Sequence, residues 1–70
     1  MAIFDNKGKE LSPCICSKAK YALGLKPKPL NNKTCTRNYW ERVVRIIAEL
    51  NNINDNSLNS AINQYNDIFT

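Results

Sequence analysis

The sequence predicts a mostly α-helical domain, a small three-helix bundle. Its 70 residues suffice for one domain with a single core. Three segments place apolar residues at the i, i+3, i+4 spacing of an amphipathic helix. A hydrophobic fraction of 43% arranged in this way is not typical of a disordered chain. We therefore treat residues 1–70 as a single small helical domain.

The residues before the first helix predict a short irregular element. Residues 6–8 have the composition of a turn. Ile3 and Phe4 precede this turn and fit either a short N-terminal hairpin or an extended lid over the core.

The first helix is predicted over residues 13–23. Ser12 is a suitable N-cap, and the proline after it fits the first helical position. Gly24 is a natural end for the helix, because glycine accepts a positive φ without strain. The spacing of the apolar residues places Lys18 and Lys20 on the outer side of this helix.

A basic loop and the second helix follow. The Lys-Pro-Lys-Pro run within residues 25–36 favours an extended, polyproline-like path. Asn38 and Glu41 have capping-box spacing, and Thr36 is the alternative N-cap. The apolar stripe of this helix consists of Tyr39, Trp40, Val43, Val44, Ile46, Ile47 and Leu50. Trp40 lies at the edge of the stripe, as either a core wall or an exposed anchor.

The third helix is predicted to run without a break to Phe69. Asp55 or Ser57 is expected to cap it. Its apolar positions at helical spacing are Leu58, Ala61, Ile62, Tyr65, Ile68 and Phe69. The core model requires that Val43, Ile47, Ile62 and Tyr65 meet.

The charge distribution predicts a basic surface. Residues 1–45 carry about +7, whereas residues 46–70 carry about −3 and contain no Lys or Arg. Such polarity indicates a face for an anionic partner, and a solvated surface that keeps a small domain soluble is the competing interpretation. The candidate binding residues of this surface are Lys18, Lys20, Lys26, Lys28, Lys33, Arg37, Arg42 and Arg45.

Catalytic and metal chemistry find little support in the sequence. Histidine is absent, and the six carboxylates are scattered without paired spacing. Cys14, Cys16 and Cys35 would need a carboxylate as fourth zinc ligand, whereas structural zinc prefers four Cys or His ligands. We therefore expect no enzyme, no metal and no cofactor, and interpret the cysteines as small buried hydrophobes.

Two further groups are candidate protein contacts. Tyr39 and Trp40 belong to the residue types that dominate binding hot spots, and they also fit a surface for self-association as a homodimer. Asn59 and Asn63 lie on the polar side of the third helix, where amides offer adaptable hydrogen bonds. Filling of the core by the aromatics, and simple solvation of the asparagines, are the competing interpretations.

These observations favour a non-catalytic, stoichiometric protein-binding regulator or inhibitor, whose target is expected in a nucleic-acid-handling machine. The alternative is a small basic DNA- or RNA-binding module that uses the Lys18–Arg45 surface. The connection between the first two helices is too long for a helix-turn-helix motif. Small size and the bias toward asparagine, with eleven such residues, resemble small phage and mobile-element proteins by composition alone. With no signal peptide or bilayer-spanning run visible, a cytoplasmic protein without membrane contact is expected.

Overall fold

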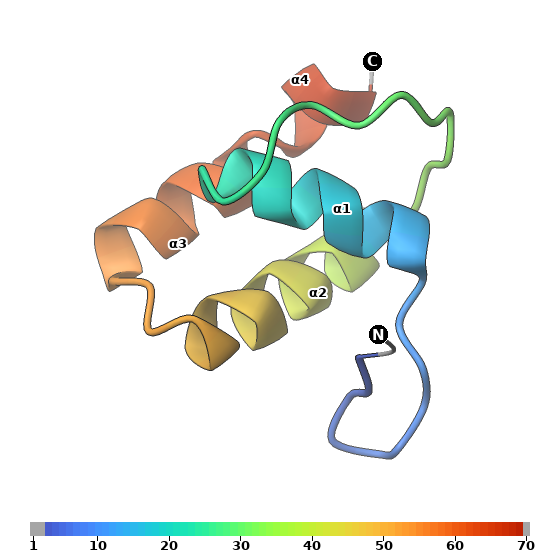
Figure 1. Cartoon of the computed structure of the whole chain (residues 1–70), viewed down its shortest axis with the longest axis vertical. Helices are drawn as coiled ribbons and strands as arrows, with labels where there is room; N and C mark the ends of the chain where they lie inside the picture. Colours follow the sequence, from blue (N-terminus) through green and yellow to red (C-terminus); the bar gives the residue numbers. More distant parts are fainter. Residues whose placement is uncertain (1–2, 70) are drawn as a thin grey trace.

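The helices form in the order that the apolar spacing predicts. The computed structural model describes residues 3–69, so that residues 1, 2 and 70 of the predicted domain lie outside it. The helices of this range are α1 (Pro13–Ala22), α2 (Arg37–Leu50), α3 (Asp55–Asn63) and α4 (Tyr65–Phe69). α1 packs against α2, and α3 contacts both (Figure 1). The small three-helix bundle is confirmed, and α4 adds one short helix at its C-terminal end.

The core gathers apolar side chains from the three longer helices and from Leu11, which precedes α1. Its buried members are Leu11, Ile15, Cys16, Ala19, Trp40, Val43, Val44, Ile47, Ala61 and Ile62. Val43, Ile47 and Ile62 meet there as predicted, and Tyr65 packs against them half-buried. Removal of these side chains from water is the main driving force for closing so small a domain.

α1 begins and ends where the sequence indicates. It starts after Ser12, which takes the N-cap position but forms no capping hydrogen bond through its side chain, and stops one residue before the predicted end, ahead of Gly24. Gly24 adopts a φ of +79°, and its N–H donates to the carbonyl of Tyr21 at 3.0 Å. The N–H of Leu25 donates to the carbonyl of Lys20 at 2.8 Å. These two bonds form a complete Schellman motif that satisfies the last carbonyls of the helix.

The same motif ends α2 without a glycine. Asn52 takes the left-handed position with a φ of +54°. Its N–H donates to the carbonyl of Glu49 at 3.3 Å, and that of Ile53 donates to the carbonyl of Ala48 at 2.9 Å. Asparagine tolerates this conformation better than most residues, which explains its use here.

The N-caps of α2 and α3 settle the alternatives left by the sequence. The Thr36 hydroxyl accepts the N–H of the third residue of α2 at 3.2 Å, so Thr36 is the cap and Asn38 is not. The Asn54 side chain accepts the N–H of Ser57 at 2.9 Å. The prediction that Asp55 or Ser57 caps α3 is therefore wrong, because the amide one residue upstream already fills that role.

The third predicted helix is interrupted, contrary to the expectation of one unbroken helix. The break falls at Gln64, whose N–H donates to the carbonyl of Ala61 at 3.2 Å. The indole N–H of Trp40 donates to the same oxygen, also at 3.2 Å. Both lone pairs of this carbonyl are thus used at the break, and α4 begins directly after it.

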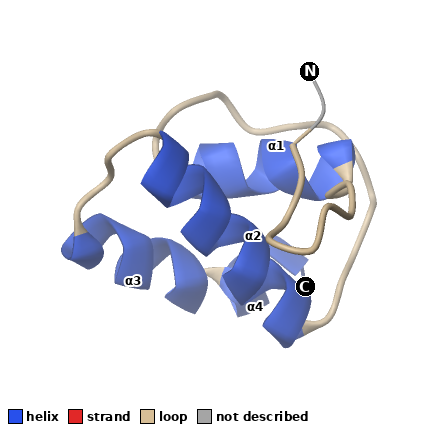
Figure 2. Cartoon of the chain, turned by 90° about the horizontal axis from the view of Figure 1, so that it is seen from below, coloured by secondary structure: helices blue, strands red, loops and turns tan. Residues whose placement is uncertain are grey.

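The N-terminal segment forms a small hairpin-like turn that also covers the core. Phe4 and Glu10 form an isolated antiparallel bridge. The N–H of Leu11 donates to the carbonyl of Ile3 at 2.7 Å, and Ile3 packs against the core. Figure 2 shows this segment doubled back beside α2. The two alternatives, hairpin and lid, therefore describe the same element.

Candidate functional site

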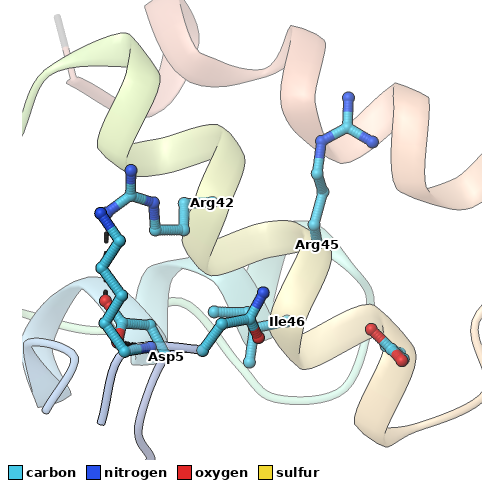
Figure 3. Close-up of a pocket in the computed structure, with 7 residues that line it drawn as sticks. Asp5, Arg42, Arg45 and Ile46 are labelled. Carbon is cyan, nitrogen blue, oxygen red and sulfur yellow. Dashed lines mark hydrogen bonds and ion pairs between the residues drawn. The ribbon is translucent and has the colours of Figure 1, made fainter. Parts of the chain in front are cut away.

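The N-terminal turn and the outer side of α2 flank an open hollow. Its volume is about 370 Å³. The turn contributes polar groups and α2 contributes mostly charged ones (Figure 3). The lining residues are Asp5, Asn6, Lys7, Arg42, Arg45, Ile46 and Glu49.

Asp5 holds the turn side of this hollow in shape. Its Oδ1 accepts the backbone N–H groups of Lys7 and Lys9, each at 2.9 Å. Gly8, with a φ of +78°, lets the chain reverse between them. The Oδ2 atom faces the guanidinium of Arg42 at 3.9 Å. One carboxylate therefore fixes the turn and links it to α2.

The same contacts favour the ionised form of Asp5. The hydrogen bond from the Lys9 N–H is the main cause that lowers its pKa below the ordinary value. Partial desolvation opposes this shift, while the Lys7 N–H and the charge of Arg42 add to it. Asp5 therefore remains a carboxylate at neutral pH and accepts rather than donates hydrogen bonds.

A second hollow, lined by both apolar and polar residues, continues the charged one. Its volume is about 400 Å³, and the two hollows share Asn6, Ile46 and Glu49. Phe4 and Leu50 flank it with 54% and 64% of their surface exposed. We call the combined surface the N-terminal groove; it is lined by residues 3–7 and by Arg42, Arg45, Ile46, Glu49 and Leu50.

Lys18 does not belong to the surface on which the sequence placed it. The residue is only 7% exposed. Its Nζ donates to the carbonyl of Lys33 at 2.6 Å and lies 4.8 Å from the ring centroid of Phe69. Lys18 follows Ile15 by three residues and thus shares its buried face. A carbonyl and an aromatic ring replace water around the ammonium group, which makes this burial tolerable.

The remaining predicted cations do not form one surface either. Arg37 lies 3.7 Å from Glu41, and Arg42 faces Asp5 in the groove. The Arg45 side chain extends in a different direction from that of Arg42, away from the N-terminal turn (Figure 3). Lys20, Lys26, Lys28 and Lys33 instead belong to α1 and to the loop that follows it, which runs along the opposite side of α1 from α2 in Figure 1. Of the Lys18–Arg45 set, Arg42 and Arg45 thus line the groove, Arg37 lies beside Glu41 at the start of α2, Lys18 is buried, and the other lysines belong to α1 and the loop.

The aromatic and amide candidates fall into two groups. Trp40 is 0% exposed and stacks edge-on against Phe69, so it is a core wall and not an exposed anchor. Tyr39 is half-buried, and its hydroxyl accepts the N–H of Ser12 at 2.8 Å, which ties α2 to the start of α1. Asn59 and Asn63 are exposed on α3, as predicted.

The three cysteines are free thiols in this structure. Cys16 is buried, whereas Cys14 and Cys35 are half-buried. Burial raises the pKa of the Cys16 and Cys35 thiols, so neither is a ready nucleophile. Within residues 3–69, no group of three or more Cys, His, Asp or Glu residues is placed to hold a metal ion.

The groove residues outside the basic set were not identified from the sequence. The sequence alone predicts Phe4 in a lid and Leu50 in the core stripe, and it indicates no role for Asp5. A local signal existed for Asp5, because Asp followed by Asn-Lys-Gly is typical of a turn stabilised by its own side chain. No local signal places Phe4 and Leu50 at the same hollow, since this depends on how the turn packs against α2.

Comparison with known proteins gives no relative of this fold. No family model matches the sequence, no curated protein matches it, and no solved structure matches the chain. None of the helices in the described range combines the length and the apolar character needed to cross a bilayer.

Proposed function

We propose that this protein is a non-catalytic, stoichiometric protein-binding regulator or inhibitor that binds its target through the N-terminal groove. One observation carries the proposal: Phe4 and Leu50 remain largely exposed beside a hollow lined by charged groups. Apolar anchors within a polar rim are typical of protein–protein interfaces. Burial of these two side chains would contribute about 1 to 2 kcal/mol each to binding.

The chemistry of the groove describes the partner. An apolar side chain fits between Phe4 and Leu50, and the neighbouring hollow offers both signs of charge through Arg45 and Glu49. Complementary charges on the partner would set the orientation of the complex and its rate of association more than its affinity. We therefore propose a partner segment with one large apolar residue and mixed charges next to it.

The setting that we propose is the cytoplasm, with a protein of a nucleic-acid-handling machine as the target. Three free thiols support a reducing compartment. The net charge of +4 supports an approach to an anionic assembly. The comparison with small phage and mobile-element proteins is supported by composition alone.

The test is quantitative capture from nuclease-treated lysate of the source cells with the immobilised protein. We expect one partner at roughly equal stoichiometry, and its retention should fall about tenfold for Leu50→Gln, since burial of a leucine contributes about 1.5 kcal/mol or more. Leu30→Gln is the matched control, because Leu30 is 102% exposed and lies in the loop outside the groove. Equal loss with both variants would refute the groove. If light scattering shows that the protein is a dimer and that Leu50→Gln makes it a monomer, the groove binds a second copy of the chain instead.

A further inference from the structure

All charged side chains between Glu10 and Glu41 are basic. Residues 11–40 contain six Lys or Arg side chains and no carboxylate. Two of the six are already engaged, since Lys18 bonds to the loop backbone and Arg37 lies beside Glu41. Across the residues that the structure describes, the other four form no ion pair. These are Lys20, Lys26, Lys28 and Lys33, which together with Tyr21 we call the loop face.

Specific hydrogen bonds hold the loop of this face in place. The Asn31 amide donates to the carbonyl of Cys14 on α1 at 3.4 Å and accepts the N–H of Lys33 at 3.1 Å. The hydroxyl of Tyr65 on α4 donates to the carbonyl of Cys35 at 2.6 Å. Prolines within the loop restrict its backbone further. The lysines are thus presented from an ordered scaffold, which lowers the entropy cost of binding.

An aromatic ring lies at the same hollow as one of these cations, Lys28. Tyr21 is 36% exposed and, with Lys28 and Asn31, lines a small hollow of about 60 Å³. A phosphate-binding lysine beside a partly exposed ring is the combination found in surfaces that hold unpaired bases.

We propose that the loop face binds single-stranded nucleic acid, with its four lysines on successive phosphates and Tyr21 stacked on one base. An irregular loop does not enter a duplex groove as a helix does, and stacking requires an unpaired base. A lipid surface is disfavoured because it would need a broad apolar face, whereas Leu25 and Leu30 are the large apolar side chains exposed in the described loop. This surface is separate from the N-terminal groove, so it provides a second activity and does not depend on the proposed function.

The probe is a fluorescein-labelled 20-nucleotide oligothymidylate, titrated by anisotropy at several salt concentrations. Four phosphate contacts predict a slope of log K against log salt of about −3. Lys26→Gln/Lys28→Gln should halve this slope and weaken binding roughly tenfold at low salt. Lys7→Gln/Lys9→Gln removes two lysines of the same spacing from the N-terminal turn and should change affinity less than about twofold.

Further variants distinguish the contribution of base stacking from that of charge, and test whether the groove takes part. Tyr21→Ala should weaken binding about fivefold or more without changing the slope, and Tyr21→Phe should retain binding. Leu50→Gln should leave it unchanged, since the groove is not involved. The proposal is overturned if the oligonucleotide does not bind at 25 mM salt, or if both lysine pairs weaken binding equally. Equal affinity for polyglutamate, or a preference for vesicles with 30% phosphatidylserine, would also overturn it by assigning the face to acidic protein or lipid.

Discussion

The indole N–H of Trp40 and the backbone carbonyl of Ala61 are joined by a hydrogen bond of 3.2 Å, and both residues are 0% exposed. The bond links α2 to the last turn of α3 at the point where the third predicted helix breaks. Phe69 of α4 packs edge-on against the same indole, with ring centroids 5.3 Å apart. A single side chain therefore connects three of the four described helices.

Replacement of this residue should be among the most damaging single changes to the core. Trp40→Phe removes the donor to Ala61 and leaves a small void, so we expect a loss of about 2 kcal/mol in the free energy of unfolding. Urea denaturation followed by circular dichroism measures this loss. Tyr21→Phe, at a partly exposed site, is the control and should change stability by less than about 0.5 kcal/mol. If Trp40→Phe lost as little stability as Tyr21→Phe, the indole N–H would not contribute to the free energy of unfolding.

Lys18 should contribute to stability as a buried cation. Lys18→Met keeps most of the aliphatic stem but removes the ammonium that bonds to the Lys33 carbonyl and faces Phe69. We expect a loss of about 1 kcal/mol, because water can partly satisfy the carbonyl that is left. Lys20→Met, two residues along α1, should have little effect. Chemical denaturation of both variants distinguishes them, and a more stable Lys18→Met would show that desolvation outweighs the contacts.

The left-handed residues after α1 and α2 make a prediction about helix ends. At both positions an alanine must adopt a positive φ, which costs about 1 kcal/mol. Beyond Gly24 and its two chain neighbours, no heavy atom lies within 4 Å of where an alanine Cβ would stand, so Gly24→Ala tests this conformational cost alone. Asn52→Ala should cost a similar amount, whereas Asn52→Gly should stay within about 0.5 kcal/mol of wild type. Thermal unfolding of the three variants checks this order.

The pKa of Asp5 gives a prediction for acid pH. Because the pKa is lowered in the folded protein, the stabilisation from Asp5 is complete above the unfolded value of about 3.9 and is lost as pH falls through the folded pKa. The difference in free energy of unfolding between wild type and Asp5→Asn should therefore shrink below about pH 3.9. Urea denaturation at pH 6 and pH 3 measures it.

A companion variant identifies the cause of the shift. Arg42→Gln removes one attractive charge, so the pKa of Asp5 should rise but stay below the ordinary value, since the Lys9 N–H is the larger cause. Titration of the side-chain carboxyl by NMR reports this directly. A return to the ordinary value in Arg42→Gln would mean that the ion pair, and not the turn, sets the pKa.

The sequence predicted the helices well because their apolar spacing is local. The stripe of α2, from Trp40 to Ile47, is visible without knowledge of any neighbour, and so is Gly24 as the end of α1. The break at Gln64 was missed because it involves a hydrogen bond from Trp40, 21 residues from Ala61 along the chain. Helical periodicity carries no information about such a contact.

The candidate site was predicted less well, for two different reasons. The burial of Lys18 had a local signal, because Lys18 follows Ile15 at helical spacing, but a charged residue is normally expected at the surface. The contacts of its ammonium group with the Lys33 carbonyl and the Phe69 ring, which allow its burial, depend on tertiary structure. The N-terminal groove had no such signal, since it joins Phe4 to Leu50 through tertiary packing. The basic residues are close together along the chain, but the fold brings the carboxylates of Glu41 and Asp5 beside Arg37 and Arg42.

The attachment of the loop by main-chain carbonyls has a consequence for how this protein can change. The oxygens of Cys14, Lys33 and Cys35 receive the bonds that fix the path of residues 23–36, and every amino acid carries such an oxygen. Substitutions at positions 33 and 35 therefore leave these acceptors in place. Residues 23–36 can therefore acquire different surface charges, in evolution or by design, while the path of their backbone along α1 is kept.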